Sequence, residues 1–134
     1  MRYDLDLVYL AAMEAGLPAS LSADQRVEID FGDGAILCFQ NAEREEDCFI
    51  GFLGTLWHAH DEIIFADPRG NFVELDYLAL ISALAGGEVL LCALQANGQI
   101  VDRWLIHGQY NNEFQHLQMG EQVLVRRAMI RPAK

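Results

Sequence analysis

The hydrophobic and polar positions near the start of the chain repeat with the period of a helix. Five apolar residues would share one helical face: Leu5, Val8, Tyr9, Ala12 and Met13. Acidic residues occupy the outer side, and Gly16 followed by Pro18 supplies residues that end helices. The pattern therefore predicts an amphipathic helix over residues 4–15.

The period changes to two at residues 26–31, where apolar and charged side chains alternate strictly. The apolar set is Val27, Ile29 and Phe31, and the charged set is Arg26, Glu28 and Asp30. This alternation is typical of a half-buried strand. Gly32-Asp33-Gly34 then offers turn residues that tolerate positive φ, so a second strand is predicted at residues 36–39.

Two further strands extend this antiparallel meander. Residues 41–47 form a polar hairpin loop, and a long apolar strand is predicted at residues 48–57. Gly51 and Gly54 interrupt that strand, which indicates a bulge or the close approach of another backbone. A short strand is predicted at residues 62–65.

A second helix is predicted in the middle of the chain. Asn71 and Glu74 have the spacing of a capping box, in which two side chains cap the first turn of a helix. Apolar residues follow at helical spacing, namely Phe72, Leu75, Leu78, Ile81 and Leu84. Gly86-Gly87 ends the pattern, so the expected helix runs from Asn71 to these glycines.

The final third of the chain predicts more strand than helix. Asn97-Gly98 suits a type I′ turn, so residues 88–94 and 99–107 should form a β-hairpin. Gly120 would break a helix continuing to Ile130, and we favour a short helical turn at 112–118 followed by a strand at 122–126. With no repeat or linker, residues 1–134 are interpreted as one α+β domain with an antiparallel sheet.

Charge narrows the range of partners. The formal net charge is −11, and residues 1–101 carry 17 acidic and 4 basic side chains, whereas residues 102–134 carry 3 and 5. Nucleic acids and anionic membranes are bound through Lys and Arg, so neither is expected as a partner. A basic protein partner fits this charge better.

The cysteines and the N-terminus indicate the compartment. Cys38, Cys48 and Cys92 form no C-x-x-C pair and lie in apolar stretches, where cysteine usually acts as a small buried hydrophobe. The first residues lack a cationic region followed by an apolar run, and no apolar run reaches membrane-spanning length. A cytoplasmic location is the expectation.

One segment gathers potential metal ligands. In an extended chain, His58, His60 and Glu62 would project from the same face, and imidazole with carboxylate can hold zinc or iron. A small metal-dependent enzyme, with Asp61 or His107 contributing, is therefore one functional hypothesis. The alternative is a strand end whose histidines bond to carboxylates and water, with no cofactor and no catalytic residue.

The other hypothesis is a non-catalytic acidic protein-binding module. Its expected partner-binding residues are the loop carboxylates Glu43, Glu45, Glu46 and Asp47, together with Trp104. Size, acidity and element order resemble two groups of small acidic bacterial proteins, which are immunity proteins and class I type III secretion chaperones. The first resemblance implies neutralisation of a toxin's basic site. The second implies a partly unfolded cargo and allows a homodimer.

Overall fold

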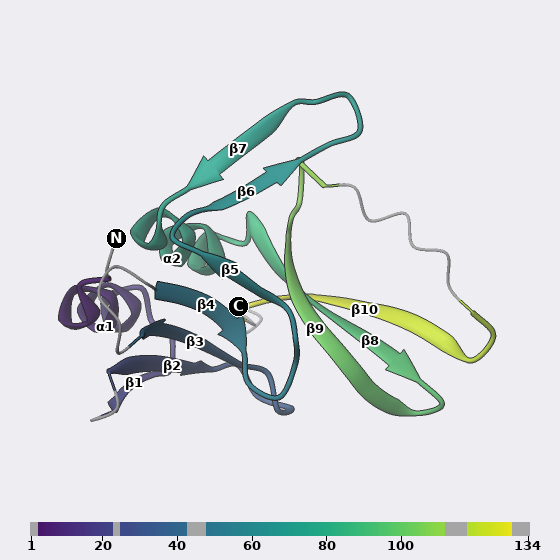
Figure 1. Ribbon diagram of the computed structural model, residues 1–134, viewed down its shortest axis with the longest axis horizontal. Coiled ribbons are helices and arrows are strands. Elements are labelled where there is room, and N and C mark those ends of the chain that lie inside the picture. Colours follow the sequence, from purple (N-terminus) through teal and green to yellow (C-terminus); the bar gives the residue numbers. More distant parts are fainter. Residues whose placement is uncertain (1–2, 23–24, 43–47, 112–117, 130–134) are drawn as a thin grey trace, which may run out of the picture.

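The computed structural model describes residues 3–22, 25–42, 48–111 and 118–129, which form an α+β domain with antiparallel sheets (Figure 1). This confirms the predicted fold class, N-terminal helix, meander and central helix. The elements are α1 (Leu5–Glu14), β1 (Ala19–Ser22), β2 (Arg26–Asp30), β3 (Ile36–Asn41), β4 (Cys48–Phe52), β5 (His58–His60), β6 (Ile63–Ala66), β7 (Phe72–Leu75), α2 (Tyr77–Gly86), β8 (Val89–Ala96), β9 (Gln99–His107) and β10 (Glu121–Arg127).

The N-terminal half contains a five-stranded meander in the order β1-β2-β3-β4-β5. In β2 and β3, Val27 pairs with Phe39 and Ile29 with Leu37, and all four side chains are buried. The alternation read at residues 26–31 therefore places the apolar side chains on one face, as predicted. Strand β1, which pairs antiparallel with β2, was not predicted.

The long strand predicted at residues 48–57 is wrong in its second half. Strand β4 ends at Phe52, the chain turns at Gly54 with φ of 80°, and β5 returns to pair with β4. Gly51 explains how the two strands lie so close, because a Cβ atom there would sit 2.9 Å from the Trp57 carbonyl oxygen. The predicted close approach of another backbone is thus confirmed at Gly51.

The helix predicted from Asn71 begins too early. Residues 72–75 form β7, which pairs with β6, and α2 starts only at Tyr77. The N-cap is Asp76, whose carboxylate accepts a 2.7 Å hydrogen bond from the Ala79 N–H. Asn71 instead donates from its side chain to Asp67 at 3.1 Å, so it belongs to the β6–β7 turn.

The hairpin around Asn97-Gly98 is confirmed. Asn97 and Gly98 have φ of 52° and 82°, and Ala96 pairs with Gln99 across the turn. The predicted C-terminal strand is also present, as β10, and it pairs with β8 to give the order β10-β8-β9. The helical turn predicted at 112–118 falls on residues 112–117, outside the described residues, and no C-terminal helix is seen within them.

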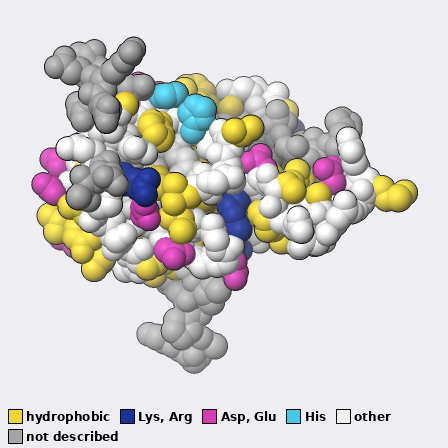
Figure 2. All heavy atoms as spheres, turned by 60° about the horizontal axis from the view of Figure 1, so that its bottom comes forward, with side chains coloured by type: hydrophobic (Ala, Val, Ile, Leu, Met, Phe, Trp, Pro, Cys, Tyr) yellow, Lys and Arg dark blue, Asp and Glu magenta, His cyan; other side chains and the backbone are white. Residues whose placement is uncertain are grey.

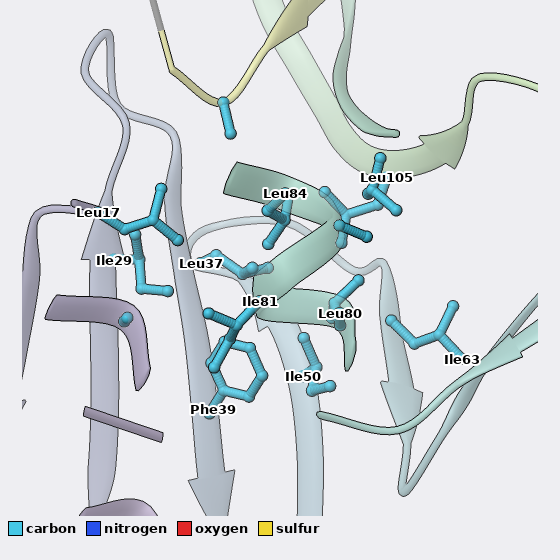
Figure 3. Close-up of a cluster of buried hydrophobic side chains, with 14 of the residues drawn as sticks. Leu17, Ile29, Leu37, Phe39, Ile50, Ile63, Leu80, Ile81, Leu84 and Leu105 are labelled. Atoms are coloured by element: carbon cyan, nitrogen blue, oxygen red, sulfur yellow. The ribbon is translucent and has the colours of Figure 1, made fainter. Parts of the chain in front are cut away.

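Helix α2 lies at the centre of the core. Figure 3 shows its Leu80, Ile81 and Leu84 between side chains of the meander on one side and Ile63 and Leu105 on the other. Burying a leucine or isoleucine contributes roughly 1.5–3 kcal/mol, so these contacts hold β6 and β9 near the meander. Within the described residues, no helix is long and apolar enough to span a membrane.

Candidate functional site

A groove runs between strands β6 and β9, which lie close together at one end in Figure 1. Its volume is about 300 Å³, and residues 62–66 and 104–106 line its two sides. Trp57 and Tyr110 also line it. Large aromatic side chains of this kind are enriched among the residues that concentrate binding energy at protein interfaces.

Aromatic rings contact one another beside this groove. The ring centroids of Phe65 and His107 lie 5.9 Å apart, and those of His107 and Tyr110 lie 5.1 Å apart. The Nδ1 atom of His107 accepts hydrogen bonds from the backbone N–H groups of Gln109 and Tyr110, at 3.0 and 3.1 Å. His107 therefore shapes the turn that brings Tyr110 back to the groove, and it does not join His58 and His60.

Trp104 is the predicted partner-binding residue that the structure places in this groove. It lies on β9, opposite Cys92 of β8, and is half-buried. Trp57 comes from the turn before β5 and packs on Phe52 with a centroid distance of 6.0 Å. The sequence did not predict that Trp57, Trp104 and Tyr110 lie close to one another. These residues come from segments that are distant in the sequence and become neighbours only through packing around α2.

Carboxylates gather beside the groove, at the end of the β6–β7 hairpin that adjoins α2. The pKa of Glu62 is raised, mainly by a hydrogen bond with the Glu74 side chain and by its negative charge, and further by burial and by Asp61 and Asp76. Among the described residues, no ion pair involves any of these four acids. A cationic side chain brought here would relieve their mutual repulsion.

The two histidines of the predicted metal set lie on a different surface. His58 and His60 are exposed on the same face of β5, with ring centroids 5.0 Å apart, and Figure 2 shows histidine side chains next to each other on the surface. They line a hollow of about 380 Å³ over β4. Their Nδ1 atoms lie 3.0 Å from the Leu56 carbonyl oxygen and 3.2 Å from the Cys48 carbonyl oxygen, respectively.

Glu62 does not join these histidines. Asp61 has φ of 60°, which interrupts the alternation of side chains after β5, and Glu62 lines the β6–β9 groove instead. Across residues 3–22, 25–42, 48–111 and 118–129, no three His, Cys, Asp or Glu side chains are grouped so that they could hold a metal ion. The remaining predicted binding residues, Glu43, Glu45, Glu46 and Asp47, lie outside the described residues.

The buried cysteines do not have the features of nucleophiles. Burial and a hydrogen bond from its Sγ to the Asp61 carboxylate, at 3.1 Å, raise the pKa of Cys48. Burial and the charge of Glu28 raise the pKa of Cys38 to about 11, although Arg26 acts in the opposite direction. A thiolate is the reactive form, so both environments disfavour nucleophilic chemistry.

Comparison with known proteins gives no relative for this chain: no family model, no curated protein and no solved structure matches it.

Proposed function

We propose that this protein is a non-catalytic binding module for a basic or partly unfolded protein partner. The observation that carries the proposal is the β6–β9 groove, whose lining combines Trp57, Trp104 and Tyr110 with Glu62, and the Glu74 carboxylate adjoins that of Glu62. Aromatic anchors supply binding energy, and acidic side chains beside them select a partner of positive charge.

The rest of the surface supports the same function. Large apolar side chains are exposed on β6 and β7, including Ile64 at 61% and Phe72 at 61%. Figure 2 shows acidic side chains dispersed among apolar ones on the visible face. A surface of this kind lets an apolar segment bind while the net charge of −11 keeps the free protein soluble.

Two biological settings fit such a module. An immunity protein would cover the basic active site of a toxin, and a secretion chaperone would hold a basic or incompletely folded cargo. Both need an acidic binder without chemistry of its own, and neither needs a metal or a cofactor. We therefore propose protein binding as the activity, and an immunity protein or a secretion chaperone as the two kinds of protein that would have it.

Co-expression with the proteins encoded by neighbouring genes tests the proposal. We expect one of them to co-purify with this chain, and the affinity to fall by about tenfold or more between about 50 and 500 mM NaCl, because charge pairing at an exposed rim is screened. Isothermal titration calorimetry on the purified pair would measure both values. Absence of any complex, or an affinity that salt does not change, would contradict a module that selects a basic partner.

A further inference from the structure

Strands β6 and β9 each have one edge to which no strand of the described residues is paired. Strand β6 pairs with β7 alone, and β9 pairs with β8 alone. Residues of β6 and β9 line the groove, whereas no residue of β7 or β8 does. The groove therefore lies along the open edge of β6, where backbone N–H and C=O groups are available to an added strand.

Strand β6 carries none of the features that normally prevent strand addition, whereas β9 carries Asp102 and Arg103 and has a register shift opposite Leu94 and Gln95. Natural proteins protect an open edge with charged residues, proline or a bulge. The sequence of β6 is Ile63-Ile64-Phe65-Ala66, and the groove segment of β9 is 104–106, Trp-Leu-Ile, so both are uncharged and rich in residues that favour strands. A third strand would also complete the β6–β7 pair, since two-stranded sheets are only marginally stable alone.

The charge beside the groove defines the chemistry of the occupant. Glu62 lines the groove and shares a hydrogen bond with Glu74, and Asp61 and Asp76 add negative charge at the same end of the hairpin. Farther along β6, Phe65 lines the groove, and its ring centroid lies 5.9 Å from that of His107. An extended segment lying along β6 would therefore present a cationic side chain at the acidic end and apolar side chains toward the aromatic lining.

We infer that the groove between β6 and β9 binds an extended segment of the partner protein by strand addition to β6. The segment has alternating apolar residues and a Lys or Arg that pairs with Glu62 and Glu74. This inference rests on the proposed function. It specifies where on this chain the partner binds and that the bound segment of the partner is an extended strand. Backbone hydrogen bonds to β6 supply affinity, and the lining and the carboxylates supply selectivity.

The inference can be tested without knowing the partner, by selecting peptides that bind the full chain from a random peptide library. We expect the enriched peptides to alternate apolar residues and to contain Lys or Arg. Ile64→Lys, which puts a charge on the β6 edge, should weaken their binding by about tenfold or more in fluorescence anisotropy. Leu10→Lys is the matched control, because Leu10 on α1 is exposed at 55% and Ile64 at 61%. It should leave the affinity unchanged.

A second measurement tests backbone pairing directly. N-methylation of alternate amides along one edge of the best peptide should abolish binding, because it removes the donors that an added strand needs. Methylation of the other edge should leave binding intact. Amide signals of residues 63–66 should shift in nuclear magnetic resonance spectra when the peptide is added, and those of α1 should not. Circular dichroism of both Lys variants establishes that they are folded.

The possible results separate the two proposals. If no peptide is enriched, or if enriched peptides bind Ile64→Lys as well as wild type, strand addition to β6 is overturned, even where a salt-sensitive complex with a neighbouring gene product supports the proposed function. If Ile64→Lys instead converts a dimer of the chain into a monomer, the groove is the contact between two copies, which also overturns the inference.

Discussion

The side-chain amide of Asn41 takes the place of a strand partner for Tyr3. Its Oδ1 atom accepts a hydrogen bond from the Tyr3 N–H at 2.8 Å, and its Nδ2 atom donates to the Tyr3 carbonyl at 2.9 Å. The hydroxyl of Tyr3 donates to the Asp61 carbonyl at 3.0 Å. Tyr3 therefore connects the chain before α1 to the end of β3 and to the turn that separates the histidines from Glu62.

Replacement of Asn41 by Ala should destabilise the fold. Asn41 is the one buried polar side chain within the described residues, and its loss leaves the N–H and C=O groups of Tyr3 without partners. An unsatisfied buried polar group costs about 1–3 kcal/mol, so we expect that decrease in the free energy of unfolding measured in urea. Gln40→Ala, at the preceding position, is the control. Equal effects of the two changes would refute this role of Asn41.

Gly51→Ala should disturb the pairing of β4 and β5. The added Cβ atom would lie 2.9 Å from the Trp57 carbonyl oxygen and 3.2 Å from the His58 Cβ atom, so the backbone of β5 would have to move. Overpacking of this kind costs roughly 1–3 kcal/mol, which urea denaturation would detect. Gly108→Ala is a matched control, because its Cβ atom would meet only the Glu88 carbonyl oxygen at 3.5 Å. A Gly51→Ala protein as stable as wild type would contradict the crowding.

The boundary between β7 and α2 shows how far the sequence pattern could be followed. Phe72 and Leu75 fit helical spacing, but residues 72–75 also fit the alternation of a strand, and pairing with β6 decided between them. The sequence predicted the structure correctly where only one local conformation fits the pattern, as at the Asn97-Gly98 turn and in the alternating strand β2. The groove could not be predicted, because β6 and β9 become neighbours only through α2.

This boundary can be tested through the helix cap. Asp76→Ala removes the acceptor of the Ala79 N–H, and loss of an N-cap typically costs about 0.5–2 kcal/mol of stability. Asn71→Ala is the informative comparison, because a helix beginning at Asn71 would make that residue the cap. We expect the free energy of unfolding and the helical circular dichroism signal to fall more for Asp76→Ala. A larger loss of stability and helical signal for Asn71→Ala than for Asp76→Ala would instead indicate that the helix begins at Asn71.

The Glu62–Glu74 pair should make stability depend on pH. A carboxyl group whose pKa is higher in the folded chain contributes stability below its unfolded pKa, and this contribution is lost as the pH rises through its folded pKa. Glu74→Gln removes the main cause of the raised pKa. We therefore expect the melting temperature of the variant to exceed that of wild type near about pH 7 and to match it near about pH 3.

Glu88→Gln controls for the change in net charge, because it removes the same charge beyond the C-terminal end of α2. Every carboxylate removed from a chain of net charge −11 reduces general repulsion, and this variant measures that background. If Glu88→Gln raises the melting temperature at neutral pH as much as Glu74→Gln does, the pairing of Glu62 with Glu74 has no specific effect on stability.

The three cysteines should be unreactive while the protein is folded. Cys38, Cys48 and Cys92 are all at most 3% exposed, and burial together with the charge of Glu28 raises the pKa of Cys38 to about 11. At about pH 8 roughly one thiol in a thousand would then be ionised at Cys38, and iodoacetamide attacks only the thiolate. Mass spectrometry should find slow alkylation of the native protein and rapid alkylation of all three sites in urea. Rapid labelling of native Cys38 would contradict this prediction. It would show a reactive thiol in the hollow lined by His58 and His60 and would support an enzymatic function for that surface.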